Sequence, residues 1–385
     1  MNFLLLFSEI SENSVFYRSI VAFILSFGIA FILYKKIIYW NHIKKNIIGE
    51  NIRNLNIFGE KKKKGTPTMG GIVMIFSTII STILFSSLKN RYVLILIFTT
   101  IYMGCIGFID DYLKIRYNNK EGISVISKLL GQIILGIFVG ITMYFNEDVQ
   151  YINIKKNNKE YYITTFPFIS TKKNPNQFGY YSSIFEEYKK NNIIVFITFV
   201  IITIVFISNG ANITDGIDGL TAGISLIIFI TLSIISIITS SITYSYYFNF
   251  IYIPNIKETI IFSLSFLGSL ISFFWYNTYP AKIFMGDCGS LTMGAVIATL
   301  TIINRKELTL PLLCVIFFIE NISVIIQVLY FIYSKKKYGV GKRIFLMAPI
   351  HHHFQKLGYH ENTIFNRFMI IQIMFSALVL ILLIY

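Results

Sequence analysis

Long runs of apolar residues are the feature of this sequence that most restricts its fold. A helix needs about 20 mostly apolar residues to cross a bilayer, and runs of this kind recur from residue 15 to residue 384. Lipid offers the backbone no hydrogen-bond partners, so only helices and closed barrels span it. The sequence has no series of short alternating segments of the kind a barrel needs. It therefore predicts an all-α integral membrane protein with about ten transmembrane helices, at Val15–Leu33, Gly70–Leu88, Tyr92–Ile109, Ser127–Phe145, Ile193–Ser208, Ala222–Ile242, Ile260–Tyr276, Gly289–Ile303, Leu310–Ile332 and Ile364–Ile384.

The composition supports this fold class. Hydrophobic residues make up 55% of the 385 residues and charged residues only 14%, whereas a soluble domain carries about 25% charged residues. A water-soluble enzyme of this length, a disordered chain and a coiled coil are thereby excluded. We expect one polytopic transmembrane domain over residues 1–385.

The basic residues predict the orientation of the chain. They account for a net charge of +15 and cluster after the first, third and ninth spans, within residues 35–64, 114–128 and 335–356. The positive-inside rule places these loops in the cytoplasm and both termini outside. The lysine-rich stretch 146–192 is then a long extracytoplasmic loop, a class that the rule weights little. A basic membrane face attracts anionic headgroups or an anionic substrate; no nucleic-acid-binding module is recognisable.

The first acidic cluster lies in GFIDDYLK, residues 107–114. The adjacent carboxylates of Asp110 and Asp111 repel each other unless a cation lies between them. Lys114 is three and four residues further on and reaches both if the helix continues. The alternative is a solvated helix end with one salt bridge.

A second polar cluster, NGANITDGIDGL, separates two apolar runs at residues 209–220. Asn212, Asp215 and Asp218 recur every three residues and share a face if this segment is helical. Glycines, Gly216 among them, let a ligand approach the backbone closely. A polar turn has a similar composition, but the density of acids and amides favours a ligand site.

The third cluster, residues 277–290, reads NTYPAKIFMGDCGS. Asp287 opens the eighth span, where free amides and the helix dipole favour negative charge. It either caps that helix or holds a metal while the amides face a phosphate. Phe284, on the preceding short loop, is suited to stack on a planar ring or to anchor the chain at the membrane interface.

Three of the five histidines are consecutive, at His351, His352 and His353. Neighbouring residues converge poorly on one ion, so hydrogen bonding to phosphate suits them better than metal binding. Glu320 lies inside the ninth span, where a carboxylate is a functional candidate; a hydrogen-bonded packing role is the alternative. KKKKGTPTMGG at residues 61–71 lacks P-loop spacing, and no GxGxxG motif occurs, so the usual nucleotide folds are not indicated.

Together these segments resemble one family, the bacterial phospho-N-acetylmuramoyl-pentapeptide transferases, within the polyprenyl-phosphate N-acetylhexosamine-1-phosphate transferase superfamily. The resemblance runs from about Lys64 to the last span. It rests on six motifs in order: KKGTPTMGG, GFIDDYLK, NGANITDGIDGLTAG, WYNTYPAKIFMGDCGSL, IENISVIIQV and APIHHHF.

The resemblance implies a reaction and a location. Undecaprenyl phosphate would attack the β-phosphate of UDP-N-acetylmuramoyl-pentapeptide, UMP would leave, and lipid I would form with the help of Mg²⁺. This is the first membrane step of peptidoglycan biosynthesis, in the bacterial cytoplasmic (inner) membrane. The family also suggests a homodimer.

The resemblance further implies roles for individual residues. Asp287 would bind Mg²⁺, and Asp110 and Asp111 would assist it as metal ligands or deprotonate the lipid phosphate. The other catalytic-site residues would be His352, His351 and Lys114. The substrate-binding residues would be Lys64, Thr68, Lys128, Asn212, Asp215, Gly216, Asp218, Asn277, Phe284 and His353, with Phe284 against uracil.

Two positions depart from the family pattern, because Leu346 stands where Arg is usual and Gln355 where Glu is usual. Two other functions stay open from the residues alone. One is transfer of a different UDP-amino-sugar phosphate, and the other is cation-coupled transport that uses Glu320 and the aspartates. A transporter more often places its acidic residues near the bilayer midplane, whereas here they cluster at the ends of spans.

Overall fold

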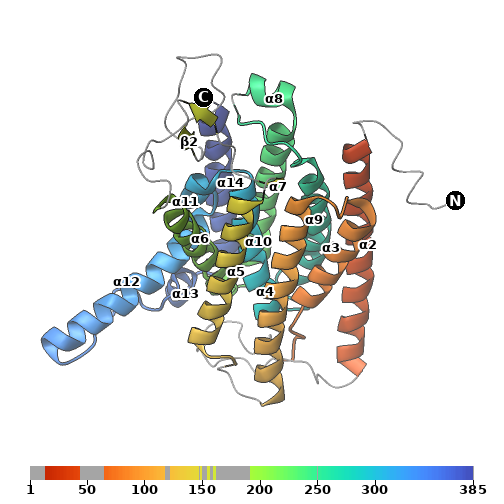
Figure 1. Cartoon of the computed structure of the whole chain (residues 1–385). Helices are drawn as coiled ribbons and strands as arrows, with labels where there is room; N and C mark the ends of the chain where they lie inside the picture. The colour runs from red at the N-terminus through yellow and green to blue at the C-terminus, as the bar shows by residue number, and fades with distance from the viewer. Residues whose placement is uncertain are drawn as a thin grey trace.

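The structure is a computed structural model that describes residues 14–43, 65–117, 122–146, 148–149, 154–156, 159–161, 191–248 and 250–384. In this part of the chain, nine helices are long and apolar enough to cross a membrane. They pack side by side as one bundle (Figure 1). The strands of the described residues are short: β1 (Ile154–Lys156) and β2 (Lys159–Tyr161) form one antiparallel pair. The predicted all-α membrane fold is confirmed.

The nine long helices correspond to nine of the ten expected spans. They are α2 (Ser14–Ile43), α4 (Arg91–Arg116), α5 (Val125–Phe145), α6 (Asn191–Thr214), α7 (Leu220–Ser240), α9 (Lys257–Asn277), α10 (Gly286–Ile303), α12 (Val315–Tyr338) and α14 (Glu361–Ile384). The second expected span is α3 (Gly71–Phe85), an apolar helix of 15 residues. The remaining helices are short: α8 (Ile242–Tyr247), η3 (Glu307–Thr309), α11 (Leu310–Leu313) and α13 (Ile350–Lys356).

Helix α10 forms the centre of the bundle, and 89% of its residues are buried. Small residues let its neighbours approach closely, as is usual for helices packed in lipid. A β-carbon on Gly107 of α4 would overlap the backbone of Asp287, and one on Gly71 of α3 would overlap the backbone of Gly289. Packing through glycine therefore places the end of α4 directly against the start of α10.

Two predicted span boundaries are wrong in ways that affect function. The third span was expected to end at Ile109, but α4 continues to Arg116. The ninth was expected to run unbroken over Leu310–Ile332. Pro311 lies in the first turn of α11, which ends at Leu313, and Cys314 is non-helical (φ −112°, ψ 37°) before α12 begins. Helix α12 then leans away from the bundle (Figure 1).

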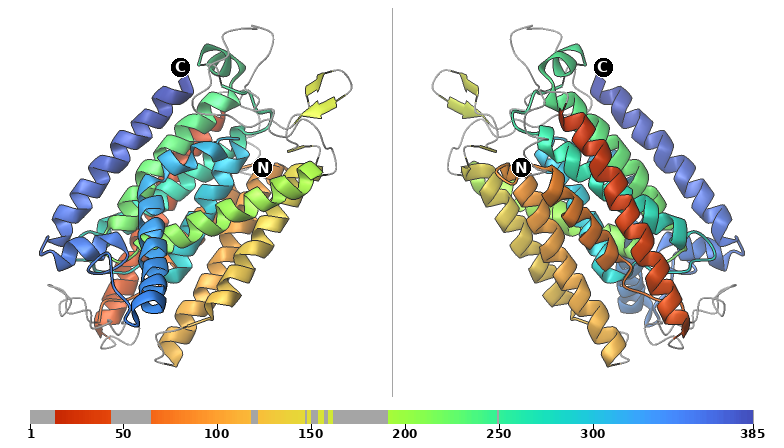
Figure 2. Two further views of the ribbon diagram at one scale, coloured as in Figure 1. Left: turned by 90° about the vertical axis from the view of Figure 1, so that its left-hand side faces the viewer. Right: turned by 90° about the vertical axis from the view of Figure 1, so that its right-hand side faces the viewer.

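The start of α2 and the end of α14 lie at the same end of the bundle, as an even number of crossings requires (Figure 1). Helix α8 and the β1–β2 pair lie at that end too, and the side views agree (Figure 2). The end of α4 lies at the opposite end. Most of the expected loop 146–192 falls outside the described residues.

Candidate active site

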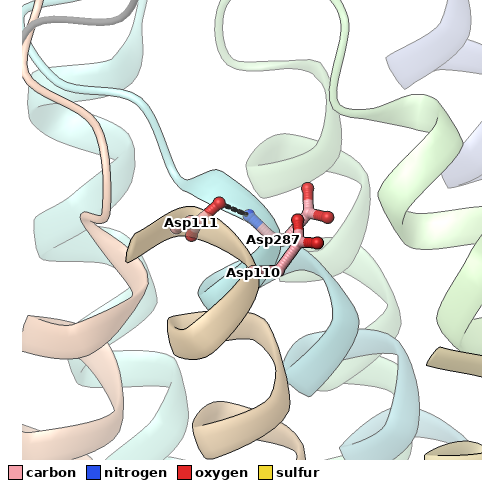
Figure 3. A group of neighbouring side chains, drawn as sticks. All are labelled: Asp110, Asp111 and Asp287. Atoms are coloured by element: carbon pink, nitrogen blue, oxygen red, sulfur yellow. Dashed lines mark hydrogen bonds between the residues drawn. The ribbon is translucent and has the colours of Figure 1, made fainter. Parts of the chain in front are cut away.

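Three aspartates meet where α4 ends and α10 begins. Asp110 and Asp111 lie near the end of α4, and Asp287 lies in the first turn of α10. Each residue offers one carboxylate oxygen, and these oxygens all lie within 4.8 Å of one another. Figure 3 shows the carboxylates of Asp110 and Asp287 next to each other and that of Asp111 on the other side, against the start of α10. The tertiary structure thus brings together the first and third acidic clusters of the sequence.

Two lysines bridge the neighbouring carboxylates. The Nζ of Lys114 lies 2.7 Å from Oδ2 of Asp110 and 3.2 Å from Oδ2 of Asp287. The Nζ of Lys128, in the first turn of α5, lies 2.9 Å and 2.5 Å from the same two oxygens. The expected i,i+4 pair of Asp110 and Lys114 is therefore present. With Asp111 counted, the cluster holds three carboxylates and two ammonium groups, a balance that favours a further cation.

Asp111 has a different environment. Its Oδ1 accepts a hydrogen bond from the backbone N–H of Asp287 (3.0 Å), and its Oδ2 accepts one from Cys288 N–H (2.9 Å). These amides belong to the first turn of α10, whose N-cap residue Met285 provides no side-chain cap. Asp111 therefore caps α10 from another helix, and the alternative that Asp287 itself is the cap is wrong.

The aspartate cluster fits a magnesium ion by its chemistry. Mg²⁺ prefers oxygen ligands and usually takes one or two carboxylates, with water and substrate phosphates completing the shell. Asp110 and Asp287 present carboxylate oxygens side by side, and the lysines next to them offer no ligand atom while protonated. The nearby Cys288 thiol is turned away, towards the carbonyl oxygen of Gly104.

The second polar cluster forms a turn between α6 and α7. Because α6 ends at Thr214, only Asn212 lies on a helix, and the expected common helical face of Asn212, Asp215 and Asp218 is wrong. Oδ2 of Asp218 accepts a hydrogen bond from the N–H of Ala281 at 3.0 Å. This bond ties the turn to the loop that leads to Asp287.

Asn277 strengthens the same connection. Its Oδ1 accepts from the N–H of Gly219 (3.1 Å), and its Nδ2 donates to the carbonyl oxygen of Ile283 (2.8 Å). Asn277 is buried and sits where α9 ends. Its position makes it a brace between the two loops.

Phe284 is half-buried and lies on a backbone pairing with the segment before α3. Its N–H donates to the carbonyl oxygen of Pro67 (2.8 Å), and its own carbonyl accepts from Gly70 N–H (2.9 Å). Thr68 is buried within that segment. The GTPTMGG motif is thereby held beside the MGD motif. Lys64 lies outside the described residues.

The three histidines lie on α13 and face different ways. His351 is fully buried, with Nδ1 3.0 Å from Oε1 of Glu320. His352 packs edge-on against it, with 4.1 Å between ring centroids, and its Nδ1 lies 2.6 Å from Oε1 of Gln355. His353 instead accepts a hydrogen bond at Nδ1 from the N–H of Leu346.

Gly216 connects the histidines to the turn after α6. A β-carbon there would overlap Nε2 of His351 and lie 3.2 Å from Nε2 of His352. The structure thus brings the histidines, the 215–219 turn and the loop before α10 into one contiguous region.

Sequence reasoning missed two backbone groups. The N–H of Ile123 donates to Oδ1 of Asp110 at 2.7 Å, just before α5. The other is the N–H of Ala281, described above. Gly122, with φ +61°, places Ile123 there, and a β-carbon on it would overlap Asp110. Gly122, a glycine within the basic loop at residues 114–128, was the available signal.

Comparison with known proteins decides the family. The model of the glycosyl transferase family 4 matches residues 93–305, more than half of the chain. A protein of Amoebophilus asiaticus is 46% identical over 394 residues, which cover 97% of this chain and 96% of the relative. Proteins of Flavobacterium psychrophilum and Flavobacterium johnsoniae are each 44% identical, covering 94% of this chain and 91% and 92% of the relatives. All three are named phospho-N-acetylmuramoyl-pentapeptide-transferase. This chain belongs to the phospho-N-acetylmuramoyl-pentapeptide-transferases.

The similarity to this family covers the whole site. The range 93–305 that matches the family model contains all three aspartates and both bridging lysines. The match to the Amoebophilus asiaticus protein, over 97% of this chain, also covers the histidine segment. The protein is therefore a multi-pass membrane transferase, as the sequence motifs indicated.

Proposed function

We propose that this protein transfers phospho-N-acetylmuramoyl-pentapeptide from UDP-N-acetylmuramoyl-pentapeptide to undecaprenyl phosphate, releasing UMP and forming lipid I. The observation that carries the proposal is the cluster of three carboxylates and two lysines at one end of a membrane bundle. The names of the relatives supply the substrate class. The location follows as the bacterial cytoplasmic membrane.

The reaction requires the neutralisation and positioning of phosphates more than covalent assistance. Lys114 and Lys128 are held on the carboxylates with their ammonium groups between two acidic residues. When the pyrophosphate of the sugar nucleotide enters, the same ammonium groups would donate hydrogen bonds to its oxygens. We propose that His352 and His353 contribute further hydrogen bonds to phosphate, and that Lys64 and Thr68 bind substrate from the segment before α3.

Asp287, Asp110 and Asp111 would hold the magnesium ion. Bound there, Mg²⁺ would neutralise charge on the phosphates and orient them. Asp287 and Asp110 contribute oxygens that lie side by side, while Asp111 holds the first turn of α10 in place. A carboxylate next to the bound lipid phosphate would also accept its proton where that phosphate is still monoprotonated.

The turn after α6 and the loop before α10 would form the nucleoside pocket. The residues proposed to line it lie in these loops or at the helix ends next to them: Asn212, Asp215, Gly216, Asp218 and Asn277. Phe284 offers a half-buried ring on which uracil would stack. A water-poor site at the bilayer edge would let a lipid phosphate compete with water. Exclusion of water favours transfer over hydrolysis.

A two-substrate assay tests the proposal. Purified protein in detergent receives undecaprenyl phosphate with either UDP-N-acetylmuramoyl-pentapeptide or UDP-N-acetylglucosamine, with and without Mg²⁺, and UMP release is measured. We expect UMP only from the muramoyl substrate, only with the lipid and only with Mg²⁺. If UDP-N-acetylglucosamine releases UMP with the lipid and the muramoyl substrate does not, the protein catalyses a different amino-sugar phosphate transfer. If neither nucleotide releases UMP, transferase activity is contradicted.

Asp287→Asn tests the metal role. The variant keeps the size of the side chain but weakens a magnesium ligand, so we expect a folded protein whose UMP release falls by about a thousandfold or more. Asp148→Asn is the matched control, because Asp148 forms an exposed ion pair with Arg91 away from the site. Near-normal turnover of Asp287→Asn would remove Asp287 from this role.

Mass measurement in detergent tests the homodimer that the family resemblance suggests.

A further inference from the structure

Glu320 is a carboxylate enclosed in the membrane-spanning part of the protein. It lies on α12, and its side chain is fully buried. Burial of a carboxylate is unfavourable unless a partner compensates its charge. Within the described residues, the basic side chain that contacts the Glu320 carboxylate is His351, which is also fully buried and whose Nδ1 lies 3.0 Å from Oε1. This contact is an ion pair when His351 is protonated.

The position of His351 links this pair to the candidate site. Its ring lies between Glu320 on one side and the turn after α6 on the other, where Gly216 leaves just enough room for Nε2. The ring of His352 packs edge-on against that of His351. His351 is fully buried and His352 only half-buried, so His352 is the ring more accessible to solvent.

The pair also joins α12, whose first turns pack on α6, to the short helix α13. Helix α12 leans away from the bundle (Figure 1), and α13 has only seven residues. A short helix has little stability of its own and depends on tertiary contacts. A shift of the His351 ring would move both the His352 ring and the segment at Gly216, because rings in contact cannot rearrange independently.

We propose that Glu320 is a positioning residue of the transferase: it fixes the ring of His351 and, through that ring, the placement of His352 and Gly216. The inference rests on the proposed role of His352 at the phosphates. Glu320 would thus act through His351 rather than by direct contact with a substrate.

Kinetics of four variants test this role. Glu320→Leu removes the charge and keeps the volume, and Glu320→Gln keeps a polar oxygen in contact with Nδ1. His351→Leu removes the ring, and the fourth variant combines Glu320→Leu with His351→Leu. We expect kcat of Glu320→Leu to fall by about tenfold or more while KM for the sugar nucleotide changes by less than about threefold. Glu320→Gln should recover most of that loss. The double variant should be no slower than His351→Leu, because the two residues act through one contact.

Glu258→Gln is the matched control. Glu258 forms an ion pair with Arg18 at 2.7 Å and lies at the start of α9, whereas Asn277 of the site ends the same helix. We expect this variant to lose thermal stability without a change in kcat. If Glu320→Leu fails to fold, the comparison of Glu320→Gln with His351→Leu decides, since a positioning role requires the first to be the more active.

Two outcomes overturn the inference. One is a Glu320→Leu enzyme with the kcat of the parent protein, and the other is an additive loss in the double variant. The His352→Ala variant tests the proposed role of His352 separately. An inactive His352→Ala enzyme together with an unaffected Glu320→Leu enzyme contradicts only the positioning role of Glu320. A fully active His352→Ala enzyme contradicts the proposed role of His352, on which the inference rests.

Discussion

The carboxylate of Asp111 accepts hydrogen bonds from the backbone N–H groups of Asp287 and Cys288, which follow it by 176 and 177 residues in the chain. One acidic residue of the candidate metal cluster thus holds the helix that carries another. The position of Asp287 depends on this cap, because Met285, the N-cap residue of α10, provides no side-chain cap. The contribution of Asp111 to the site is therefore structural as well as electrostatic.

Removal of the cap should affect both stability and activity. Asp111→Ala leaves two buried amides without their acceptor, and loss of a helix cap typically costs about 0.5–2 kcal/mol. We expect a lower melting temperature and a loss of UMP release, measured by thermal unfolding in detergent and by the two-substrate assay. Asp111→Asn keeps one oxygen acceptor and should be more stable than Asp111→Ala. Equal melting temperatures of Asp111→Ala and the parent protein would contradict the capping role.

The approach of α4 to α10 should not tolerate a larger residue at its closest point. Gly107→Ala would force a β-carbon into the backbone of Asp287 and push the two helices apart. We expect a marked loss of thermal stability and of UMP release. Gly28→Ala is the control, since a β-carbon there meets nothing within 4 Å. A Gly107→Ala protein as stable and active as Gly28→Ala would show that the helices are less tightly packed than described.

Lys128 should compete with a divalent cation for the same carboxylates. Lys128→Met removes one of the two ammonium groups that bridge Asp110 and Asp287, so their repulsion is less well compensated. We expect the metal-free variant to melt lower than the parent protein, and added Mg²⁺ to raise its melting temperature by more than that of the parent. Lys336→Met, at an exposed position near the end of α12, is the control. An identical Mg²⁺ response in both variants would argue against a shared cation position.

A buried lysine at the opposite end of the bundle should make stability depend on pH. Burial lowers the pKa of Lys306 from its ordinary 10.5 to about 7, against the opposing effect of Glu307, and its Nζ lies 4.4 Å from the centre of the Phe250 ring. Between about pH 7 and pH 10.5 the unfolded chain binds more protons at this lysine than the folded protein, so its contribution to stability rises with pH.

Thermal unfolding from pH 7 to higher pH measures this contribution. The melting temperature of the parent protein should rise relative to that of Lys306→Met, which has no proton to lose at this position. Parallel pH curves for the two proteins would mean that Lys306 keeps its charge when folded.

Much of this fold follows from the sequence alone. Apolar runs determine the spans, because a bilayer accepts a helix of sufficient length whatever its neighbours are. Nine of the ten expected spans are long apolar helices, and the local pair of Asp110 and Lys114 has its expected spacing on one of them. Six motifs in order indicated the family before any packing was known.

The tertiary structure alone decided how the site is assembled. The cap of α10 by Asp111, the bridge from Lys128 to Asp287 and the contact of Glu320 with His351 join residues on different helices. Such contacts depend on how closely the helices pack. Glycines such as Gly107 permit close packing, but the sequence does not show which helix packs against each of them. Helix length is a local property of the chain in lipid, whereas the direction of a buried side chain depends on every helix around it.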